Sequence, residues 1–512
     1  MYIGEAPIGR RMSITAIEER SLAELQSDLA ARRVTSEELT VCYQERIERL
    51  DRNGPCLFSV IERNPDANAI ARSLDDELMS KGPRGPLHGI PILIKDNIDT
   101  RDRMATTAGS LALLGLEPQE DAFLVQRLRA AGAVILGKTN MSEWANGRSR
   151  QSSSGWSARG GLTRNPYALD RSASGSSSGS AVAVAASLCA AAVGTETDGS
   201  ILSPASVCGV VGLKPTVGLI SRRGIIPISH SLDTPGPMAR TVRDCALLLA
   251  ALTGADALDP AMRGSAAHTR QDYSSALDSN ALNGARLGVV RQFSGFHDGV
   301  EKIYLHALTA LKSAGAVLLD PVTLPDIDTL RAAKRTVLLY EMKAGLNAYL
   351  QRMGHHAPVQ SLADVIAFNV LNSATEMPYF TQDIFLMAQA KGPLSDAEYL
   401  EALATCQRVA GIDGIEKVLH DNRLDALIAP TGGPAWCTDL VLGDHAIGGS
   451  SSPAAAAGTP SISVPAGNVH GLPVGLSFFA EAWSEMKILN LGYAFEQVTR
   501  ARQPPHYLPS LA

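Results

Sequence analysis

Hydrophobic positions along the chain follow two patterns, helical spacing and short continuous apolar runs. Residues 22–51 show the helical spacing, which predicts two short amphipathic helices with Ser36 as the N-cap of the second. The same spacing returns over residues 65–80 and, more weakly, over 301–420. The apolar positions that define the second helix are Leu39, Cys42, Ile47 and Leu50.

Continuous apolar runs between glycines and prolines predict strands that are buried on both faces. Residues 85–96 form such a run, and a predicted helix over 121–132 and a strand over 133–138 follow it. Residues 425–430 and 460–465 repeat the strand pattern near the C-terminus. Alternation of strand and helix is typical of an α/β fold. Because no repeat and no long linker divides the chain, we expect residues 1–512 to form one large α/β domain.

The composition narrows the classes of function. Hydrophobic residues make up 45% of the 512 residues, charged residues 19%, and the net charge of -6 comes without any block of Lys or Arg. This predicts a folded protein that binds neither nucleic acid nor a membrane, since no run reaches the roughly 20 apolar residues of a membrane span. Seven scattered cysteines suit reduced thiols. No signal-peptide pattern follows Arg10 and Arg11, which favours a cytoplasmic location and leaves open that an export signal was removed.

The Gly/Ser-rich segment 172–180 carries the candidate chemistry. It has the composition of a flexible linker, but an almost unbroken run of small apolar residues, 181–192, follows at once and predicts a buried helix. A helix from Gly179 to Ala190 would be about 18 Å long, and a strand over 191–194 would bring the chain back. The next loop would then place Ser200 near Ser176. Lys95, at the C-terminal end of its apolar run, lies where α/β sheets place functional groups.

Several segments in a fixed order resemble the amidase-signature family. The central ones are Gly175-Ser176-Ser177 before the small-residue helix and Gly199-Ser200-Ile201 after it. The core of the match spans about 85–240, and segments near the C-terminus extend it. The further matching segments are 89–97, 137–144, 208–216, 231–240, 430–431 and 471–476.

The resemblance implies a cofactor-free, metal-free hydrolase with a mixed, largely parallel, twisted sheet covered by helices on both faces. It divides the domain into N-terminal helices (1–80), the signature core (85–240), a helical substrate-channel region (300–420) and C-terminal strands with a helix (421–512). By position, Ser200 corresponds to the nucleophile that forms an acyl-enzyme. Ser176, preceded by a cis peptide bond, corresponds to the bridging serine, and Lys95 to the base. The oxyanion hole corresponds to the backbone amides of Thr197, Asp198, Gly199 and Ser200.

Physical chemistry supports these roles. A serine hydroxyl is a weak nucleophile until a base takes its proton. Lysine can act as that base only when neutral, so desolvation must lower its pKa from about 10.4 toward 7–8. The apolar run before Lys95 supplies that environment. Strand alternation should turn Asp96 to the opposite face, where its charge does not hold the lysine protonated.

Departures from the common family pattern indicate the substrate. This chain has Glu196, Asp198 and Leu202 where many family members have an aspartate, a glycine and an arginine. The sequence of these segments is similar to the branch of bacterial peptide amidases. Peptide C-terminal amides are therefore the first expectation, with aryl amides, fatty amides, carbamates and esters left open. Ser177 and aromatic or Met side chains in 335–395 are candidates for substrate binding, although ordinary helix packing explains the latter equally well. Those side chains are Tyr340, Met377, Tyr379, Phe380, Phe385 and Met387.

Other hypotheses remain at this stage. Ser177 fits a G-x-S-x-G nucleophile elbow, which would need His230 or His445 as base. Ser484 and Lys487 fit S-x-x-K but favour a helix start, and His355-His356 favours a solvated helix end over a metal site. The chain could also be a non-catalytic scaffold or the amidase subunit of a tRNA-dependent amidotransferase. As an independent enzyme it is expected to be a monomer or homodimer acting on a small-molecule or peptide amide.

Overall fold

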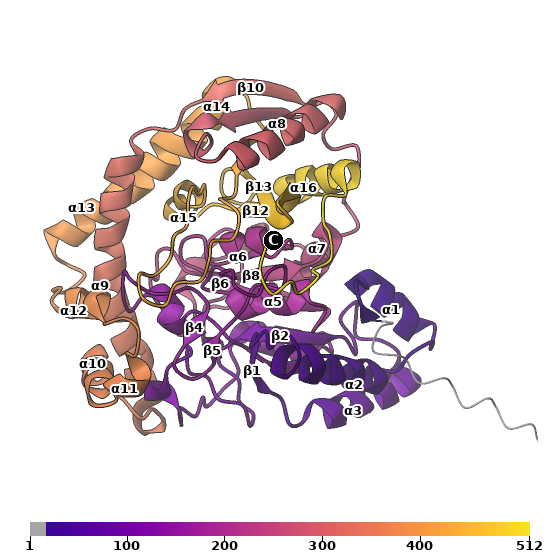
Figure 1. Ribbon diagram of the computed structural model, residues 1–512, viewed down its shortest axis with the longest axis vertical. Helices are drawn as coiled ribbons and strands as arrows, with labels where there is room; N and C mark the ends of the chain where they lie inside the picture. Colours follow the sequence, from indigo (N-terminus) through magenta and orange to yellow (C-terminus); the bar gives the residue numbers. More distant parts are fainter. Residues whose placement is uncertain (1–16, 512) are drawn as a thin grey trace, which may run out of the picture.

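A single eleven-stranded sheet runs through the molecule and takes strands from both halves of the chain (Figure 1). The computed structural model describes residues 17–511, so the N-terminal arginines considered for an export signal lie outside the described residues. The strand order is β1-β3-β2-β6-β8-β7-β12-β13-β11-β9-β10. The strands are β1 (Val60–Arg63), β2 (Pro91–Lys95), β3 (Val134–Thr139), β6 (Ala191–Glu196), β7 (Val211–Lys214), β8 (Thr234–Ala239), β9 (Arg286–Val290), β10 (Val317–Val322), β11 (Ala426–Pro430), β12 (Ser461–Val469) and β13 (Leu472–Phe479), with β4 (Trp156–Ser157) and β5 (Gly161–Leu162) in a separate ribbon.

The sheet is mixed, as expected, but its parallel pairs lie toward the two ends. β2 pairs in parallel with β3 and β6, and β9 does so with β10 and β11. The central strands β6, β8, β7, β12 and β13 pair antiparallel, as do β1 with β3 and β11 with β13. The expected predominance of parallel pairs is therefore wrong: within the described residues, six of the ten strand pairs of this sheet are antiparallel. A crossover helix is needed between parallel neighbours, whereas β12 and β13 are joined by a short turn.

Several helices pack against the sheet, whereas those between 327 and 457 pack mainly on one another. The shorter ones are α1 (Leu22–Ala30), α2 (Ser36–Arg46), α4 (Phe123–Ala130), α5 (Ser178–Ala185), α6 (Leu202–Val207), α7 (Val242–Leu252), α10 (Leu362–Leu371), α11 (Ser373–Glu376), α12 (Asp383–Gln389), α13 (Ala397–Cys406), α14 (Lys417–Asn422) and α15 (Ser452–Ala457). The longer ones are α3 (Ala67–Lys81), α8 (Asp298–Ser313), α9 (Ile327–Met353) and α16 (Glu485–Thr499). No helix in the described part of the chain is both long enough and apolar enough to cross a bilayer.

Two local predictions need correction. The N-cap of α2 is Thr35, whose hydroxyl accepts from the Glu38 N–H while the Glu38 carboxylate accepts from the Thr35 N–H. Ser36 is the first helical residue and donates its hydroxyl to the carbonyl of Gly89. The small-residue helix is also shorter than predicted, because α5 ends at Ala185 and a turn leads into β6.

This architecture gathers the signature segments at one edge of the sheet. β2 lies between β3 and β6, and α5 packs against these strands. Between β10 and β11 the chain leaves the sheet, and α9, α12 and α13 form an arc along one side of the molecule (Figure 1). The site is therefore built on a rigid sheet, with helices of the later chain beside it.

Candidate functional site

Lys95 ends β2 with its side chain fully buried. Its Nζ lies 2.8 Å from the Oγ of Ser176, 3.0 Å from the Oγ of Ser177, and 2.9 and 3.1 Å from the Oγ1 and carbonyl oxygen of Thr195. All of these partners are neutral. A buried ammonium surrounded by hydroxyls and a carbonyl loses hydration without gaining an ion pair.

The pKa of Lys95 follows from this environment. Burial lowers it to about 7, against the opposing charges of Asp233 and Glu196. Asp96 turns to the other face of the strand, as predicted, where it accepts from the Gly109 N–H at 3.0 Å and pairs with Arg159 at 3.1 Å. Burial therefore makes the neutral form of Lys95 available near neutral pH.

The turn before α5 presents two serines to Lys95. The Gly175–Ser176 peptide bond is cis, the isomer that the family resemblance implies. A Cβ on Gly175 would lie 2.1 Å from the Oγ of Ser142, so only glycine fits there. The Ser176 carbonyl accepts from the Ser142 N–H at 3.1 Å, which ties the turn to the chain after β3.

Ser200 lies beside this turn, in the loop between β6 and α6. Its carbonyl accepts from the Ser177 N–H at 3.1 Å. This backbone hydrogen bond brings Ser200 next to the turn that carries Ser176, 24 positions before it in the sequence. The structure gathers Lys95, Ser176 and Ser200 in one place, as predicted from the returning strand.

The backbone between Thr197 and Ser200 forms a turn. Gly199 has φ +78°, a left-handed conformation that glycine adopts at little cost. Within residues 17–511, the N–H groups of Asp198, Gly199 and Ser200 donate to no carbonyl or side chain. Unpaired N–H groups on successive residues are the donors that an oxyanion hole requires.

Carboxylates fix both sides of this turn. Glu196 accepts from the N–H groups of Ile201 and Leu202 at 2.7 and 3.0 Å, satisfying donors at the start of α6. The Thr197 hydroxyl donates to Asp233 at 2.6 Å. Glu196 therefore binds the backbone at Leu202, the position where many family members have an arginine.

Two cavities border the loop from different sides. One, about 230 Å³, reaches the residues directly before the two serines, Gly175 and Gly199. The other, about 570 Å³, is larger and mostly apolar, and it reaches Thr195 and Thr197 but not the residues flanking Ser176. We take the smaller cavity as the candidate site because it adjoins both serines.

The smaller cavity includes residues that sequence reasoning missed. They come from the segment between β11 and α15, more than 200 positions after Ser200, and only the Pro430-Thr431 match pointed to that region. Asp444 is the charged one, and it accepts from the Ser154 N–H and the Trp436 indole at 3.0 and 3.2 Å. The cavity lining from this segment is Thr431, Gly432, Gly433, Trp436, Asp444, Ala446, Ile447, Gly448, Gly449 and Ser451.

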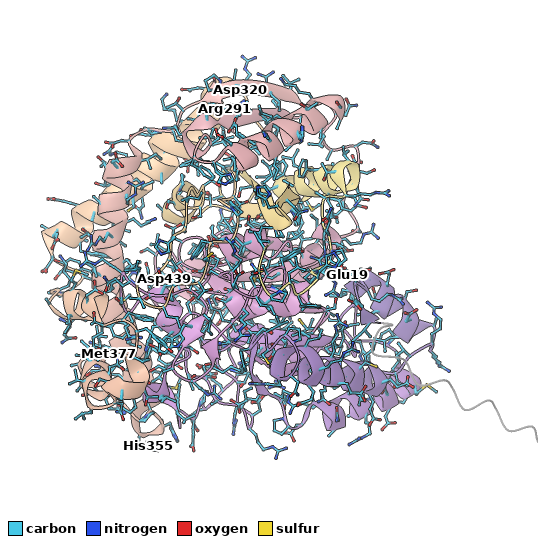
Figure 2. The ribbon with its side chains drawn as sticks, in the orientation of Figure 1. Glu19, Arg291, Asp320, His355, Met377 and Asp439 are labelled. Carbon is cyan, nitrogen blue, oxygen red and sulfur yellow. The ribbon has the colours of Figure 1, made fainter. Side chains whose placement is uncertain are left out.

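The side chains proposed for substrate binding lie elsewhere. Phe380 is buried against Trp156 and Arg148, and Tyr379 packs edge-on against Trp156. Met377 lies next to α10 and α11, at the far end of the helical arc (Figure 2). Neither cavity has these three residues in its lining, which agrees with the packing explanation. Ser177, in contrast, contacts Lys95 directly.

The competing motifs gain no support from the geometry. Ser177 bonds to Lys95 and to the backbone of Thr195, whereas His230 faces Glu341 and His445 faces Asp439. Ser484 precedes α16 but makes no side-chain cap bond.

The rings of His355 and His356 lie 3.9 Å apart, tilted by 39°, at the end of the arc, with His355 labelled in Figure 2. No group of His, Cys, Asp and Glu able to hold a metal occurs within the described chain.

Comparison with known proteins identifies the family. The family model described as Amidase matches residues 38–489. A probable amidase of Arabidopsis thaliana is 41% identical, covering 99% of this chain and 95% of its own. A glutamyl-tRNA(Gln) amidotransferase subunit from Halorhodospira halophila is 36% identical over 94% and 97% of the two chains.

Among solved structures, the native peptide amidase of Stenotrophomonas maltophilia superposes with a TM-score of 0.90. It is 51% identical and covers 96% of this chain and 99% of its own. Matches of this length and identity, together with the fold, show that this chain belongs to the amidase family, the hydrolases that cleave carbon–nitrogen bonds of linear amides.

Proposed function

We propose that this enzyme hydrolyses the C-terminal amide of peptides, or a related small amide, and releases ammonia through an acyl-enzyme on Ser200. The observation that carries the proposal is the contact between a buried, partly neutral Lys95 and Ser176, next to Ser200. The choice of peptide amides is supported by the similarity to the Stenotrophomonas maltophilia enzyme along nearly the whole of both chains.

The hydrogen bonds around Lys95 favour transfer of a proton from Ser176. The Ser177 hydroxyl donates its one proton to the Thr195 carbonyl, so toward Lys95 it can only accept. The Thr195 carbonyl can also only accept. A neutral lysine has two N–H groups and one lone pair. With one proton directed to Ser177 and the other shared by the carbonyl and hydroxyl oxygens of Thr195, the lone pair faces the Ser176 hydroxyl.

The reaction then follows in two stages. Ser200 attacks the amide carbon while its proton passes to Ser176 and the Ser176 proton passes to Lys95. The oxygen that gains negative charge is held by the N–H groups of residues 198–200. Lys95 returns its proton through Ser176 to the departing nitrogen, and ammonia leaves. Water then attacks the acyl-enzyme by the same relay and frees a carboxylic acid and Ser200.

Room for a peptide lies on one side of the serines. When ammonia is the leaving group, the rest of the substrate is on the acyl side. The 230 Å³ cavity shares Gly448, Gly449 and Ser451 with a further cavity of about 580 Å³. Phe293, Phe296 and Arg331 are among the residues that line the second cavity. The smaller cavity offers space for the C-terminal residue of a peptide amide, and the second cavity for the residues before it.

The second candidate is an amidotransferase component, which the Halorhodospira halophila relative favours. Such a component would act on glutamine in a complex. Turnover of simple amides by the isolated chain distinguishes the two candidates.

The first test is ammonia release from C-terminally amidated dipeptides by the purified chain. We expect turnover by wild type and loss of at least about 10³-fold in Ser200→Ala, because no nucleophile remains. Ser206→Ala is the matched control. It lies on α6 with its hydroxyl accepting from the Gly475 N–H, and it should keep most of the activity. Equal turnover by Ser200→Ala would contradict the assignment, and turnover of glutamine only with added partners would favour the amidotransferase.

The pH dependence tests the base. Since Lys95 must be neutral to accept a proton, kcat/KM should rise with pH and level off above its pKa of about 7. The measurement is the rate from about pH 5.5 to 9, with fluorescence confirming the fold at each pH. A flat profile, or a rate that still rises without levelling off at pH 9, as for an ordinary lysine with a pKa of about 10, would exclude Lys95 as a desolvated base.

Substrate length tests the second cavity. Phe296→Ala removes apolar surface from its lining, so kcat/KM for amidated tripeptides should fall about 3- to 10-fold, the equivalent of about 1 kcal/mol. A single amino-acid amide serves as the internal control and should be unaffected. Equal losses on long and short amides would show that the peptide does not extend into this cavity.

A further inference from the structure

Asp198 connects the loop of Ser200 to helices from the later part of the chain. Its carboxylate accepts from the hydroxyls of Ser451 and Ser452 at 2.6 and 2.8 Å and forms an ion pair with Lys334. Lys334 also donates to Ser452 at 2.7 Å. Lys334 belongs to α9, and Ser451 and Ser452 to the start of α15. We refer to Asp198, Lys334, Ser451 and Ser452 as the Asp198 clasp.

The clasp is largely shielded from solvent. The exposed fraction of the side chain is 12% for Lys334 and 22% for Asp198. Exposed ion pairs contribute little because water screens them, but a partly buried pair with two further hydroxyl donors holds a defined geometry. Many family members have glycine at the position of Asp198. This anchor therefore depends on the loop sequence that resembles the peptide amidase branch.

The clasp holds the backbone that presents the free N–H groups. Ser451 Oγ lies 3.0 Å from the position a Cβ on Gly199 would take, so α15 packs directly on the turn. The other side chains of the loop, Glu196 and Thr197, bond toward α6 and Asp233. Asp198 supplies the opposing anchor, on the side of the cavity. Lys334 lines neither the 230 Å³ cavity nor the 580 Å³ cavity.

We propose that Lys334 is a positioning residue for amide hydrolysis, which holds Asp198 and thereby directs the N–H groups of residues 198–200 at the developing oxyanion. The inference rests on the proposed function of the site. It also couples the helical arc to the chemistry, because Lys334 lies on α9 and a shift of this helix would move the hydrogen-bond donors.

The expected signature is a loss in kcat without a matching change in KM. Misplacing catalytic groups by about 1 Å costs on the order of 10²-fold, and the donors act mainly on the transition state. Lys334→Met should therefore lower kcat about 10- to 100-fold on an amidated dipeptide and leave KM within about twofold.

A peptide aldehyde gives a readout that does not depend on turnover. Its carbonyl carbon bonds to the Ser200 oxygen, and the carbonyl oxygen takes up the serine proton or remains as an oxyanion beside residues 198–200. Lys334→Met should weaken binding of the aldehyde by the same factor as kcat. Binding of the corresponding peptide alcohol, which forms no covalent bond, should not change.

Three further variants separate positioning from general stability. Lys334→Arg keeps the charge and donors and should restore most of kcat. Asp198→Asn combined with Lys334→Met should be no worse than the poorer single variant, because both break one unit. Lys343→Met is the matched control on α9, where the lysine bonds the carbonyls of Gln389 and Lys391, and it should keep wild-type kcat.

The outcomes are distinguishable. Unchanged kcat in Lys334→Met, or a rise in KM alone, overturns the positioning role. A loss of kcat that Lys334→Arg does not restore also overturns it, if Lys343→Met shows the same loss of kcat for the same drop in Tm. If wild type releases ammonia from none of the amides, the proposed function fails, while the ratio of aldehyde affinities between wild type and Lys334→Met still tests the clasp.

Discussion

Burial of Lys95 among neutral hydrogen-bond partners is the constraint on which the site depends. A fully buried lysine at the end of β2, the third strand from one edge of the sheet, has no water to solvate its ammonium, and the hydroxyls and carbonyl around it compensate only in part. The pKa near 7 results from this imbalance. A carboxylate in place of Ser176 or Ser177 would remove it, because an ion pair would keep the lysine protonated.

Two other buried lysines show how specific this environment is. Lys138 donates hydrogen bonds to the Ile98 carbonyl and the Thr106 hydroxyl, and Lys214 donates to the Pro215 carbonyl. Burial lowers the pKa of both, and that of Lys214 to about 8. Neither bonds a serine hydroxyl. Burial therefore lowers the pKa of lysines on several strands, and the serine turn distinguishes Lys95 from the other two.

Glycines allow the two serine loops to approach. Gly175 has no room for a side chain against Ser142, and Gly199 takes a left-handed turn under Ser451. The Asp198 clasp and the Glu196 contacts then hold the second loop from opposite sides. The order in the site comes from backbone and carboxylate anchors around a few small residues at the edge of the sheet.

The sequence predicted the parts of this arrangement that depend on local pattern. The apolar run before Lys95, the small-residue helix after Ser176 and the loop at Ser200 were all evident, and the family resemblance added their roles. The antiparallel middle of the sheet was not, because strand pairing depends on contacts between distant segments. The cavity lining around Asp444 and the tie between Asp198 and Lys334 were missed for the same reason, since each joins residues more than 100 positions apart.

The prediction of substrate-binding residues in 335–395 was based only on the aromatic and Met side chains there. Such side chains line pockets and also pack between helices, so their presence does not distinguish the two. Trp156, which packs against Tyr379 and Phe380, could not have been assigned to them from spacing.

The protonation state of Lys95 is the most direct test of this account. NMR of isotopically labelled lysine side chains, with Lys95→Arg to assign the Nζ signal, would follow its titration in the resting enzyme. We expect a midpoint near pH 7, the value to which burial lowers its pKa. A side chain that stays protonated up to about pH 10, as in a solvated lysine, would contradict the central claim that the fold itself supplies a neutral base.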